Sequence, residues 1–403
     1  MSQPAALSLA PVAGIRLGTA CAGIRYADRR DLVLLEAAPG STGAAVFTRN
    51  AFCAAPVTVA KQHLMVSAPR YLVVNTGNAN AGTGRQGLEA TQATCRAVAE
   101  LMGCQLHEVL PFSTGVIGEP LPVARLIAGL PQARAALRAD GWLDAAWGIM
   151  TTDTRPKAAS SQVVIADHPV TITGITKGAG MIRPDMATML AFVATDAGVT
   201  QGLLQRCLEA AVNESFNAIT VDGDTSTNDA CVLLATGCSG LTITAEDHQA
   251  YTLLAAAVKA VCIELAQALV RDGEGTTKFI TIQIEQGRNA AECRQVAYTI
   301  AHSLLVKTAF FAGDPNWGRI LAAVGRAGLD ALDLEAIAIH LDEVCVVCNG
   351  GRAADYTEAQ GQQVMSRRDI TIRVQLGRGR TSARVWTTDL SFEYVRINAE
   401  YRT

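Results

Sequence analysis

Aromatic residues and excess charge are both scarce in this chain of 403 residues. Phe, Trp and Tyr make up 5% of the sequence, while hydrophobic residues of all kinds make up 49%. A core must therefore be built mainly from Ala, Val, Leu and Ile, and the composition is that of a large globular α/β protein of two or three domains. The formal net charge is −3, so no nucleic acid and no anionic membrane is expected as a partner.

Signals of secreted and membrane proteins are also lacking. No basic residue precedes Arg16, which argues against a secretory signal, and the eleven cysteines do not have the spacing of a disulfide framework. We therefore expect reduced thiols in a cytoplasmic protein. The longest apolar segment, residues 253–270, contains Lys259 and Glu264, and it predicts a buried or amphipathic helix rather than a membrane span.

Metal and phosphate sites lack their usual sequence patterns. Cys345 and Cys348 form a lone CxxC, without the second pair or nearby histidines that a zinc or redox site needs. Residues 222–229 hold three aspartates, but the glycine and terminal glutamate of an EF-hand are missing. The stretch 177–180 has its lysine before its glycines, unlike a phosphate loop. We therefore expect neither a metal site nor a phosphate loop.

Hydrophobic periodicity predicts strands and helices along the whole chain. Strands are expected at residues 32–36, 44–48, 71–74, 109–113, 189–195, 279–285 and 340–347, and strands 370–376 and 381–388 are expected to form a hairpin. Helices are expected at residues 86–102, 122–130, 131–139, 143–149, 201–213, 245–270, 289–311 and 319–326. The Gly- and Asn-rich stretch 75–84 fits either a surface loop or a loop whose N–H groups meet a ligand.

The stretch 177–190 combines a broken turn with a buried strand. Two glycines interrupt the chain, and the turn 183–185 contains a proline, which lacks an N–H and keeps the preceding residue out of a helix. The apolar run 189–195 then predicts a buried strand. Thr188 therefore lies where a tight turn enters a strand, although a threonine before a strand is also common in purely structural turns.

This stretch resembles the cleavage and nucleophile segment of the glutamate N-acetyltransferase family, also called ornithine acetyltransferase. The family pattern is roughly Lys-Gly-Ser-Gly-Met-Ile-x-Pro-x-Met-Ala-Thr-Met-Leu, and the chain departs from it with Ala179 in place of serine. Similar blocks follow the family's order at residues 75–81, 150–154, 222–229 and 313–319, and 222–229 is interpreted as a structural loop near the active cleft. The resemblance implies an α/β fold with the layered αββα-type architecture of the autoprocessing, N-terminal-nucleophile-like class.

The resemblance also implies self-cleavage between Ala187 and Thr188. Its products would be an α chain of residues 1–187 and a β chain of residues 188–403, intertwined in one fold with a C-terminal subdomain at about residues 280–403. Cleavage would turn Thr188 into an N-terminal nucleophile. Its own α-amino group, with a reference pKa of about 7.7–8.0, would then be its base.

An oxyanion hole is implied at the end of the predicted strand 109–113. The glycine in Ser113-Thr114-Gly115 permits a sharp turn that points N–H groups outward, as an oxyanion hole requires. The tripeptide alone is ordinary turn chemistry. The matching residues of the family stabilise the oxyanion, and this role is therefore implied for Thr114 and Gly115.

Substrate-binding residues are implied in the same way. They are Thr151, Lys177, Thr188, Glu274, Asn398 and Thr403, with Thr152 a near equal of Thr151. Lys177 can meet a substrate carboxylate and Glu274 a substrate ammonium. The structural alternative for both is a solvated residue in a turn.

The implied reaction is transfer of the acetyl group from N2-acetyl-L-ornithine to L-glutamate in arginine biosynthesis, by a ping-pong mechanism through acetyl-Thr188. No cofactor is implied, and acetyl-CoA is an open second donor. The partners would be these small molecules, with no nucleic acid or membrane, and two α and two β chains would form a heterotetramer in the cytoplasm. A related autoprocessing aminopeptidase, with water as acceptor, is the first alternative, and a non-enzymatic amino-acid-binding protein is the second.

Overall fold

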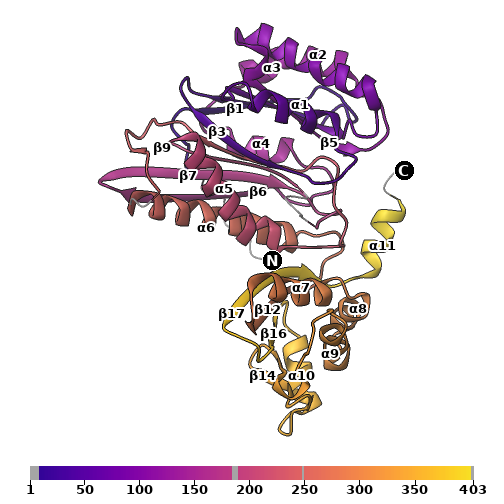
Figure 1. Ribbon diagram of the computed structural model, residues 1–403. Coiled ribbons are helices and arrows are strands. Elements are labelled where there is room, and N and C mark those ends of the chain that lie inside the picture. Colours follow the sequence, from indigo (N-terminus) through magenta and orange to yellow (C-terminus); the bar gives the residue numbers. More distant parts are fainter. Residues whose placement is uncertain (1–8, 184–188, 247–248, 401–403) are drawn as a thin grey trace. The chain divides into compact units, whose positions relative to one another are not determined.

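The computed structural model describes residues 9–183, 189–246 and 249–400 (Figure 1). The chain forms two compact units, each with its own apolar core. Unit 1 comprises residues 1–217 and 224–269, and unit 2 comprises residues 218–223 and 270–403. By residue number, the predicted cleavage position falls inside unit 1 and not at a boundary between the units.

Two sheets form the centre of unit 1. In spatial order, the first contains β1 (Ile15–Ala20), β2 (Leu32–Ala37), β4 (Tyr71–Asn78) and β5 (Val109–Val116). The second contains β3 (Thr42–Phe47), β10 (Ala230–Ala235), β8 (Leu190–Thr195), β7 (His168–Lys177) and β6 (Lys157–Ile165), and the short strands β9 (Gly198–Val199) and β11 (Thr242–Ile243) pair separately. The predicted buried strand 189–195 is confirmed as β8, whose residues are all buried.

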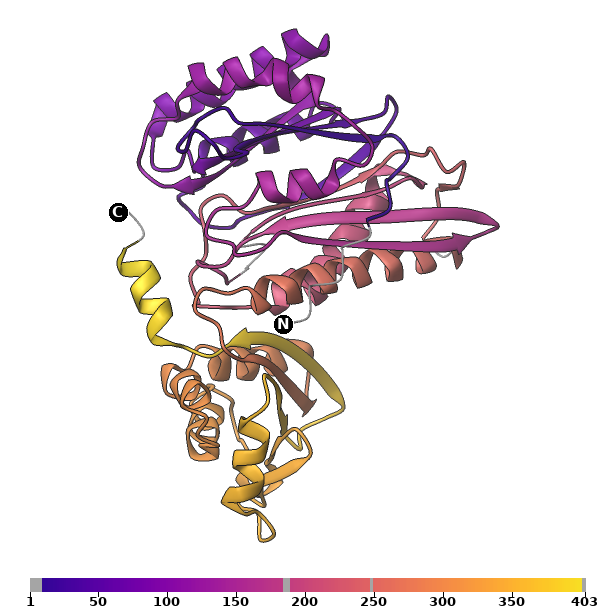
Figure 2. The same ribbon diagram turned by 180° about the vertical axis from the view of Figure 1, so that it is seen from behind.

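Helices cover the outer faces of these sheets. Figures 1 and 2 show α2 and α3 on the first sheet and α5 and α6 on the second. The helices of unit 1 are α1 (Ala55–Leu64), α2 (Gly84–Met102), α3 (Val123–Ala135), α4 (Trp142–Gly148), α5 (Gln201–Glu214) and α6 (Gln249–Arg271), the last of which ends in unit 2, and a short 3₁₀ turn lies at Leu106–Glu108. The predicted layered αββα architecture is confirmed for unit 1.

The strand pattern explains why the layers form. Along β2, Val33 and Leu35 face the core between the two sheets, while Leu32 and Leu34 face the helices. A strand covered on both faces is therefore apolar along most of its length, here at every position except Glu36, and it shows no alternation of polar and apolar residues.

The core between the sheets fixes the strand ends that carry the predicted site. Phe112 of β5 and Phe192 of β8 meet edge to face, with ring centroids 5.1 Å apart. Helix α4 adds Trp142, Ala145 and Ala146 to the same core. Because aromatic contacts of this kind bury a large area in a defined geometry, β5 and β8 are rigidly placed relative to each other.

Two helices were expected at 122–130 and 131–139, and this prediction is wrong. A single helix, α3, runs from Val123 to Ala135 with Pro131 inside it. Proline removes one backbone hydrogen bond and favours a break. The buried residues Leu126, Leu130 and Ala133, however, recur at helical spacing and pack on the first sheet. Tertiary packing therefore holds the helix together through the proline.

Helix α6 is long and apolar enough to cross a membrane by length and composition alone. Half of its most apolar window is buried inside the protein. Its Leu265 packs against Gly174 of β7, where an added side-chain carbon would lie 2.9 Å from the leucine methyl group. These contacts agree with the predicted buried helix, since the core helix of a globular protein passes the same test.

Unit 2 is built on one sheet. In spatial order it contains β15 (Gly351–Arg352), β14 (Val344–Cys348), β13 (Ala338–Leu341), β16 (Asp369–Gln375), β12 (Phe279–Gly287) and β17 (Thr381–Thr388). Its helices are α7 (Ala290–Ala301), α8 (Leu304–Ala312), α9 (Trp317–Gly325), α10 (Glu358–Met365) and α11 (Phe392–Ala399), and 3₁₀ turns lie at Phe216–Ala218, between the units in sequence, and at Leu334–Ala336. The stretch 289–311, predicted to be helical, forms two helices, and Ser303 caps the second one.

The predicted hairpin of 370–376 and 381–388 is wrong. β12 lies between β16 and β17, parallel to the first and antiparallel to the second. The N–H groups of Arg378 and Gly379 both donate to the carbonyl of Gln286 near the end of β12. The connecting loop is thus anchored across the end of β12, and the two strands pass on its opposite sides. Hydrophobic patterning detects strands but not this insertion.

The predicted strand 340–347 is also wrong, because it is a hairpin of β13 and β14. Leu341 pairs with Val344, which leaves Asp342 and Glu343 as the turn. Asp342 has a φ of +48°, a left-handed conformation that aspartate tolerates better than most residues. Two adjacent acidic residues inside an apolar run were the signal of this turn.

Candidate functional site

The residues predicted as the oxyanion hole lie within a strand. β5 continues to Val116, so the predicted strand end at Ser113 and the sharp turn at Gly115 are wrong. A β-bulge at Asn78 of the neighbouring strand disturbs the pairing opposite Thr114 and Val116. Gly115 has a φ of +137°, and an added side-chain carbon would lie 2.3 Å from the Gly77 carbonyl carbon. Only glycine fits at this position, and the bulge supplies the irregular backbone that the prediction assigned to a turn.

Lys177 meets Thr114 inside unit 1. Lys177 is the last residue of β7 and is 9% exposed. Its Nζ donates to Thr114 Oγ1 over 3.1 Å. Two residues that are 63 positions apart in sequence, both predicted to belong to the site, are thus in direct contact. A buried ammonium beside a hydroxyl concentrates positive potential, which is the electrostatic environment that a developing oxyanion requires.

A buried ion pair supports this end of β7. Asp153 Oδ1 accepts hydrogen bonds from Lys157 Nζ (2.6 Å) and the Gly178 N–H (2.7 Å), and its Oδ2 accepts one from the Thr151 N–H (2.9 Å). The side chains of Asp153 and Lys157 are almost fully buried. Burial raises the pKa of Asp153, but the neighbouring Lys157 and Lys177 outweigh it and lower this pKa to about 2. The carboxylate therefore ties the 151–153 loop to the chain that follows Lys177.

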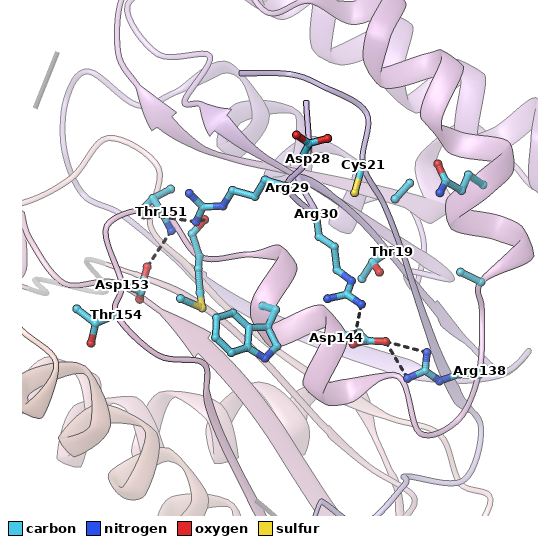
Figure 3. A pocket seen from close by; sticks show the side chains of 15 residues that line it. Thr19, Cys21, Asp28, Arg29, Arg30, Arg138, Asp144, Thr151, Asp153 and Thr154 are labelled. Carbon is cyan, nitrogen blue, oxygen red and sulfur yellow. Dashed lines mark hydrogen bonds and ion pairs between the residues drawn. The ribbon is translucent and has the colours of Figure 1, made fainter. Parts of the chain in front are cut away.

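Thr151 lines a cavity of about 780 Å³ in unit 1 (Figure 3). Arg29 Nη2 donates to the carbonyl oxygens of Met150 (2.7 Å) and Thr151 (3.1 Å). Further along the wall, Asp144 lies between Arg30 and Arg138 and pairs with both. Thr152 is not among the described lining residues. The preference for Thr151 over Thr152 stays a prediction.

The Asn-rich stretch 75–84 is not a surface loop. The side chains of Asn75, Asn78 and Asn80 are all buried. Asn75 Oδ1 accepts from Ser113 Oγ (2.6 Å), and Asn75 Nδ2 donates to the Asn78 carbonyl (2.9 Å). These amides satisfy the backbone at the bulge, so the stretch supports the end of β5 from within the fold.

Asn228 supports the same strand from another direction. It belongs to the block 222–229, and its Nδ2 donates to the carbonyl oxygens of Ala79 (2.6 Å) and Ser113 (2.9 Å). The second bond is made to the peptide group that carries the Thr114 N–H. The predicted structural role of the block thus has a specific target, which sequence reasoning did not identify.

Unit 2 holds the other predicted substrate residues. Glu274 is 9% exposed, and its Oε2 accepts a hydrogen bond from Asn398 Nδ2 over 2.8 Å. Ser391 Oγ, at the start of α11, donates to the carbonyl of Gly275 over 2.7 Å. Gly275 has a φ of +67°, and an added side-chain carbon would lie 2.5 Å from the Tyr394 backbone nitrogen. Helix α11 therefore packs tightly on the loop that presents Glu274.

Buried polar groups hold this loop in place. Asp389 accepts hydrogen bonds from the N–H groups of Thr277 and Lys278, each at 2.9 Å. Lys307 of α8 donates to the carbonyl of Thr388. Burial lowers the pKa of Lys307 to about 8, although Asp389 and Asp222 oppose the shift. These bonds hold Thr388 and Asp389, at the end of β17, in place.

Three residues of the predicted site, Ala187, Thr188 and Thr403, lie outside the described residues. Among the residues that are described, no group of three or more His, Cys, Asp and Glu side chains could hold a metal ion. Cys345 is half-buried and Cys348 is exposed, and burial raises the pKa of the Cys345 thiol. A raised pKa keeps a thiol protonated and unreactive.

Sequence reasoning missed Asp153 and Lys157 as well as Asn228. Their signal lay in the sequence all the same. Asp153 stands inside the block 150–154, and Lys157 follows it by four residues at the start of β6. In the sequence, a charged pair of this kind is typical of an exposed turn, and only the fold shows that it is buried.

Comparisons with known proteins agree with these features. A model of the ArgJ family matches residues 16–403. The chain is 61% identical to the arginine biosynthesis bifunctional protein ArgJ of Methylococcus capsulatus, covering 98% of this chain and 97% of the relative. It is 56% identical to the protein of the same name from Pseudomonas fluorescens, covering 98% of each. A crystal structure of the arginine biosynthesis bifunctional protein argJ from Bacillus halodurans is 39% identical, covering 53% of this chain and 100% of that one, with a TM-score of 0.51. The chain belongs to the ArgJ family.

Proposed function

We propose that the protein is a glutamate N-acetyltransferase that moves an acetyl group from N2-acetyl-L-ornithine to L-glutamate in arginine biosynthesis. The observation that carries the proposal is the buried contact between Lys177 and Thr114 at the end of β5, in a chain of the ArgJ family. Curated relatives are named arginine biosynthesis bifunctional proteins. Acetylornithine, ornithine and glutamate each carry charges of both signs, whereas N-acetylglutamate carries only carboxylates.

The proposed nucleophile is Thr188. An intact threonine hydroxyl is a poor nucleophile and needs a base. Self-cleavage between Ala187 and Thr188 supplies one, because it converts the amide nitrogen of Thr188 into an α-amino group with a reference pKa of about 7.7–8.0. The α-amino group takes the hydroxyl proton while the oxygen attacks the acetyl carbonyl.

The first half-reaction then forms acetyl-Thr188. The carbonyl oxygen becomes an oxyanion, which Thr114 and Gly115 stabilise. The ammonium of Lys177, hydrogen-bonded to the Thr114 hydroxyl, adds positive charge nearby. The α-ammonium group returns its proton to the departing amine, and ornithine leaves. In the second half-reaction the amine of glutamate attacks the ester, and the same groups return the hydroxyl of Thr188. No metal or cofactor takes part in these steps.

We assign the charged side chains of the predicted site to substrate groups of opposite charge. Lys177 is suited to a substrate carboxylate, and Glu274 to the side-chain ammonium of ornithine. Asn398 holds the Glu274 carboxylate in unit 2, and Thr151 and Thr403 complete the proposed set of substrate contacts. Recognition of a zwitterion by charges of both signs discriminates against ligands that lack either charge, since a buried unpaired charge is costly.

The length of a solved relative supports cleavage at residue 188. A cut there would leave a C-terminal chain of 216 residues out of 403. The Bacillus halodurans chain is covered completely, yet it spans only 53% of this chain, close to the share of that fragment. We propose that two α chains (residues 1–187) and two β chains (residues 188–403) assemble into a heterotetramer in the cytoplasm.

Acetyl-CoA is proposed as a second donor. The curated relatives are named bifunctional, and an acetyl-CoA-dependent amino-acid N-acetyltransferase activity would supply the second function. The same acetyl-Thr188 intermediate serves both donors, because only the leaving group differs. One assay with each donor in turn decides between a bifunctional and a monofunctional enzyme.

The test follows the acetyl group. The purified protein is incubated with carbon-13-acetyl-labelled N2-acetylornithine, with and without unlabelled glutamate, and the products are identified by mass spectrometry. We expect labelled N-acetylglutamate and free ornithine in the first reaction and little turnover in the second. Rapid release of free acetate without glutamate would instead favour a hydrolase of the aminopeptidase type, and no turnover of any donor would favour an amino-acid-binding protein.

A further inference from the structure

The acceptor of the proposed reaction carries one more carboxylate than the donor. Glutamate has an α- and a γ-carboxylate, whereas acetylornithine has one carboxylate and a side-chain ammonium. Among the side chains proposed to contact substrate, Lys177 is the only cation, and Glu274 has the wrong sign for a carboxylate. The γ-carboxylate of glutamate therefore needs a second cationic partner, because a charged group that leaves water without one is costly.

The loop between β1 and β2, residues 21–31, lies at the same end of the first sheet as Thr114. Leu32, which follows the loop, pairs with Asn75 of β4, and Asn75 pairs in turn with Ser113 of β5. Neighbouring strands are about 4.7–4.9 Å apart, and one strand, β4, separates β2 from β5. The loop thus emerges close to the proposed oxyanion hole.

Hydrogen bonds hold this loop in one conformation. The buried carboxylate of Asp31 accepts the N–H groups of Ala22 and Ile24, each over 2.6 Å. Arg125 of α3 donates from Nη1 to the carbonyl of Gly23 over 2.7 Å. Side chains that the loop carries are therefore presented from a rigid support.

Arg29 of this loop lines the cavity of about 780 Å³ that Thr151 also lines (Figure 3). It is partly buried, and its Nη2 donates to the carbonyl oxygens of Met150 and Thr151. The guanidinium is thereby held beside a proposed substrate contact. Its Nε and Nη1 make no hydrogen bond with any residue that the structure describes. Because all three guanidinium nitrogens carry N–H donors, those of Nε and Nη1 are available to a ligand.

Arg29 also differs from the other cations of the cavity in its charge balance. The described residues that line the cavity include six charged side chains, which are Arg29, Arg30, Arg138, Asp28, Asp144 and Asp153. Asp144 pairs with Arg30 and Arg138, and Asp153 pairs with Lys157. Asp28 is exposed to solvent. Within the described part of the chain, Arg29 forms no ion pair with a carboxylate, so its charge is free to attract an anion.

We propose that Arg29 binds the γ-carboxylate of glutamate in the second half-reaction and thereby selects the acceptor. The inference rests on the proposed function, which supplies glutamate as acceptor. The N–H groups of Nε and Nη1 donate to the γ-carboxylate while Lys177 binds the α-carboxylate. The side chain of acetylornithine ends in an ammonium and gains nothing from Arg29. The residue is therefore a specificity-determining residue for the acceptor and not for the donor.

A ping-pong reaction allows the two half-reactions to be measured separately. The enzyme is acetylated with labelled acetylornithine, and quenched-flow mass spectrometry gives the rate of this step. The acetyl-enzyme is then freed of small molecules by rapid gel filtration and mixed with increasing concentrations of glutamate or of glutamine, which lacks the γ-charge. The loss of the acetyl group from the enzyme is followed in the same way. A third series uses acetyl-CoA as donor.

Two variants and a matched control enter this assay. Arg29→Gln removes the charge but keeps an amide that can donate to the carbonyl oxygens of residues 150 and 151. Arg29→Lys keeps the charge. The control is Arg30→Gln, because Arg30 is an exposed arginine of the same cavity whose partner Asp144 also pairs with Arg138.

We expect the loss to be confined to glutamate. In Arg29→Gln the glutamate concentration for half-maximal deacetylation should rise about tenfold to a hundredfold. Deacetylation by glutamine should not change, so the preference for glutamate over glutamine should fall by the same factor. Arg29→Lys should recover part of the preference. Acetylation by acetylornithine should keep the wild-type rate in both variants, and the control should match the wild type throughout.

Three results would overturn the inference. An equal loss in both half-reactions would show that Arg29 only holds the chain at residues 150 and 151. A wild-type preference for glutamate over glutamine in both variants would remove Arg29 from acceptor recognition. A loss confined to acetyl-CoA would assign the cavity to a phosphate group.

The outcome does not depend on a single variant. If Arg29→Gln fails to fold, Arg29→Lys decides by the same criteria, with a smaller expected change for glutamate. A wild-type protein that forms no acetyl-enzyme with acetylornithine would refute the proposed function itself, so the two failures are distinguishable.

Discussion

Lys177 in unit 1 and Glu274 in unit 2 carry opposite charges, and different kinds of groups hold them in place. In unit 1, a hydroxyl of β5 accepts a hydrogen bond from the buried Lys177, and the nearby carboxylate of Asp153 pairs with the buried Lys157. Around Glu274, a single carboxylate is presented by a loop and held by an amide from α11. We propose that the first region stabilises charge during acetyl transfer and that the second, on a loop, recognises the substrate. We therefore expect variants of the first to change kcat and variants of the second to change KM.

The largest expected effect is that of Thr188→Ala. Removal of the hydroxyl removes both the group that attacks the Ala187 carbonyl and the nucleophile of acetyl transfer. The variant should purify as one uncut, inactive chain, whereas Thr188→Ser should be cut slowly and retain some transfer. Electrophoresis and the transfer assay measure both properties. Cleavage that persists in Thr188→Ala would point to an outside protease, and activity in that variant would remove Thr188 from the mechanism.

Lys177→Met should have the next largest effect. The loss of an ammonium next to the proposed oxyanion hole is expected to lower kcat on the order of a hundredfold to a thousandfold. Lys177→Arg keeps the charge and should recover part of the rate. Steady-state kinetics with acetylornithine measure the effect in protein shown to be cut. If Lys177→Met changed only KM, Lys177 would be a substrate contact without a part in stabilising charge.

Glu274→Ala tests the substrate contact that we propose for unit 2. Loss of a charge-assisted hydrogen bond to the ammonium of ornithine should lower kcat/KM for acetylornithine by about tenfold to a hundredfold. Cleavage and kcat should change little. The matched control is Glu358→Ala, a glutamate at the start of α10 in the same unit. An unchanged kcat/KM in Glu274→Ala, with cleavage complete, would refute the assignment of Glu274.

Deletion of the last six residues, 398–403, should have a smaller effect of the same kind. It removes the amide of Asn398 that holds the Glu274 carboxylate but leaves the carboxylate itself in place. We expect cleavage to proceed and transfer to decline, with KM for acetylornithine raised. Asn398→Ala isolates the amide from the rest of the tail. Full activity in the truncated protein would show that the tail only packs on unit 2.

The two units should also differ in how their stability depends on pH. The pKa of Asp153 in unit 1 is lowered from 3.8 to about 2. The stability that it provides is therefore present above about pH 4 and is lost as the pH falls toward 2, by an amount on the order of 2 kcal/mol. The pKa of Lys307 in unit 2 is lowered from 10.5 to about 8. The unfolded chain then binds more protons between these values, so unit 2 gains stability as the pH rises from 8 to 10.5.

Hydrogen exchange in segments of each unit measures these changes separately. Lys307→Met should abolish the alkaline gain in unit 2 and leave the acid loss in unit 1 unchanged. Asp153→Asn should abolish the acid loss of stability in unit 1 and leave the alkaline gain in unit 2 unchanged. An alkaline gain that survives in Lys307→Met would assign it to another group.

The same comparison shows what sequence reasoning can and cannot find. The periodicity of residues 189–195 identified β8, and the short blocks around Lys177 and Glu274 identified residues that the structure brings into contact with Thr114 and Asn398. These signals are local. Two features depend on contacts between residues about 90 or more positions apart. They are the insertion of β12 between β16 and β17 and the hydrogen bond from Asn228 to the Ser113 carbonyl, and no periodicity of the sequence encodes them.

Burial explains the remaining misses. Asp153 and Lys157 are residue types typical of a surface turn, and only the tertiary fold makes them a buried ion pair. Pro131 signals a helix break, yet the apolar stripe of α3 overrides it. In each case the deciding free energy comes from tertiary packing, which a sequence window does not contain.

The most direct test of the account is to trap the acetyl-enzyme. The purified protein is mixed with N2-acetylornithine in the absence of glutamate, quenched in acid, and its chains are weighed and fragmented by mass spectrometry. We predict a C-terminal chain of 216 residues that begins Thr-Met-Leu-Ala-Phe and carries one acetyl group on the hydroxyl of Thr188, which disappears when glutamate is added. An uncut chain, or an acetyl group on any other residue, would contradict the account.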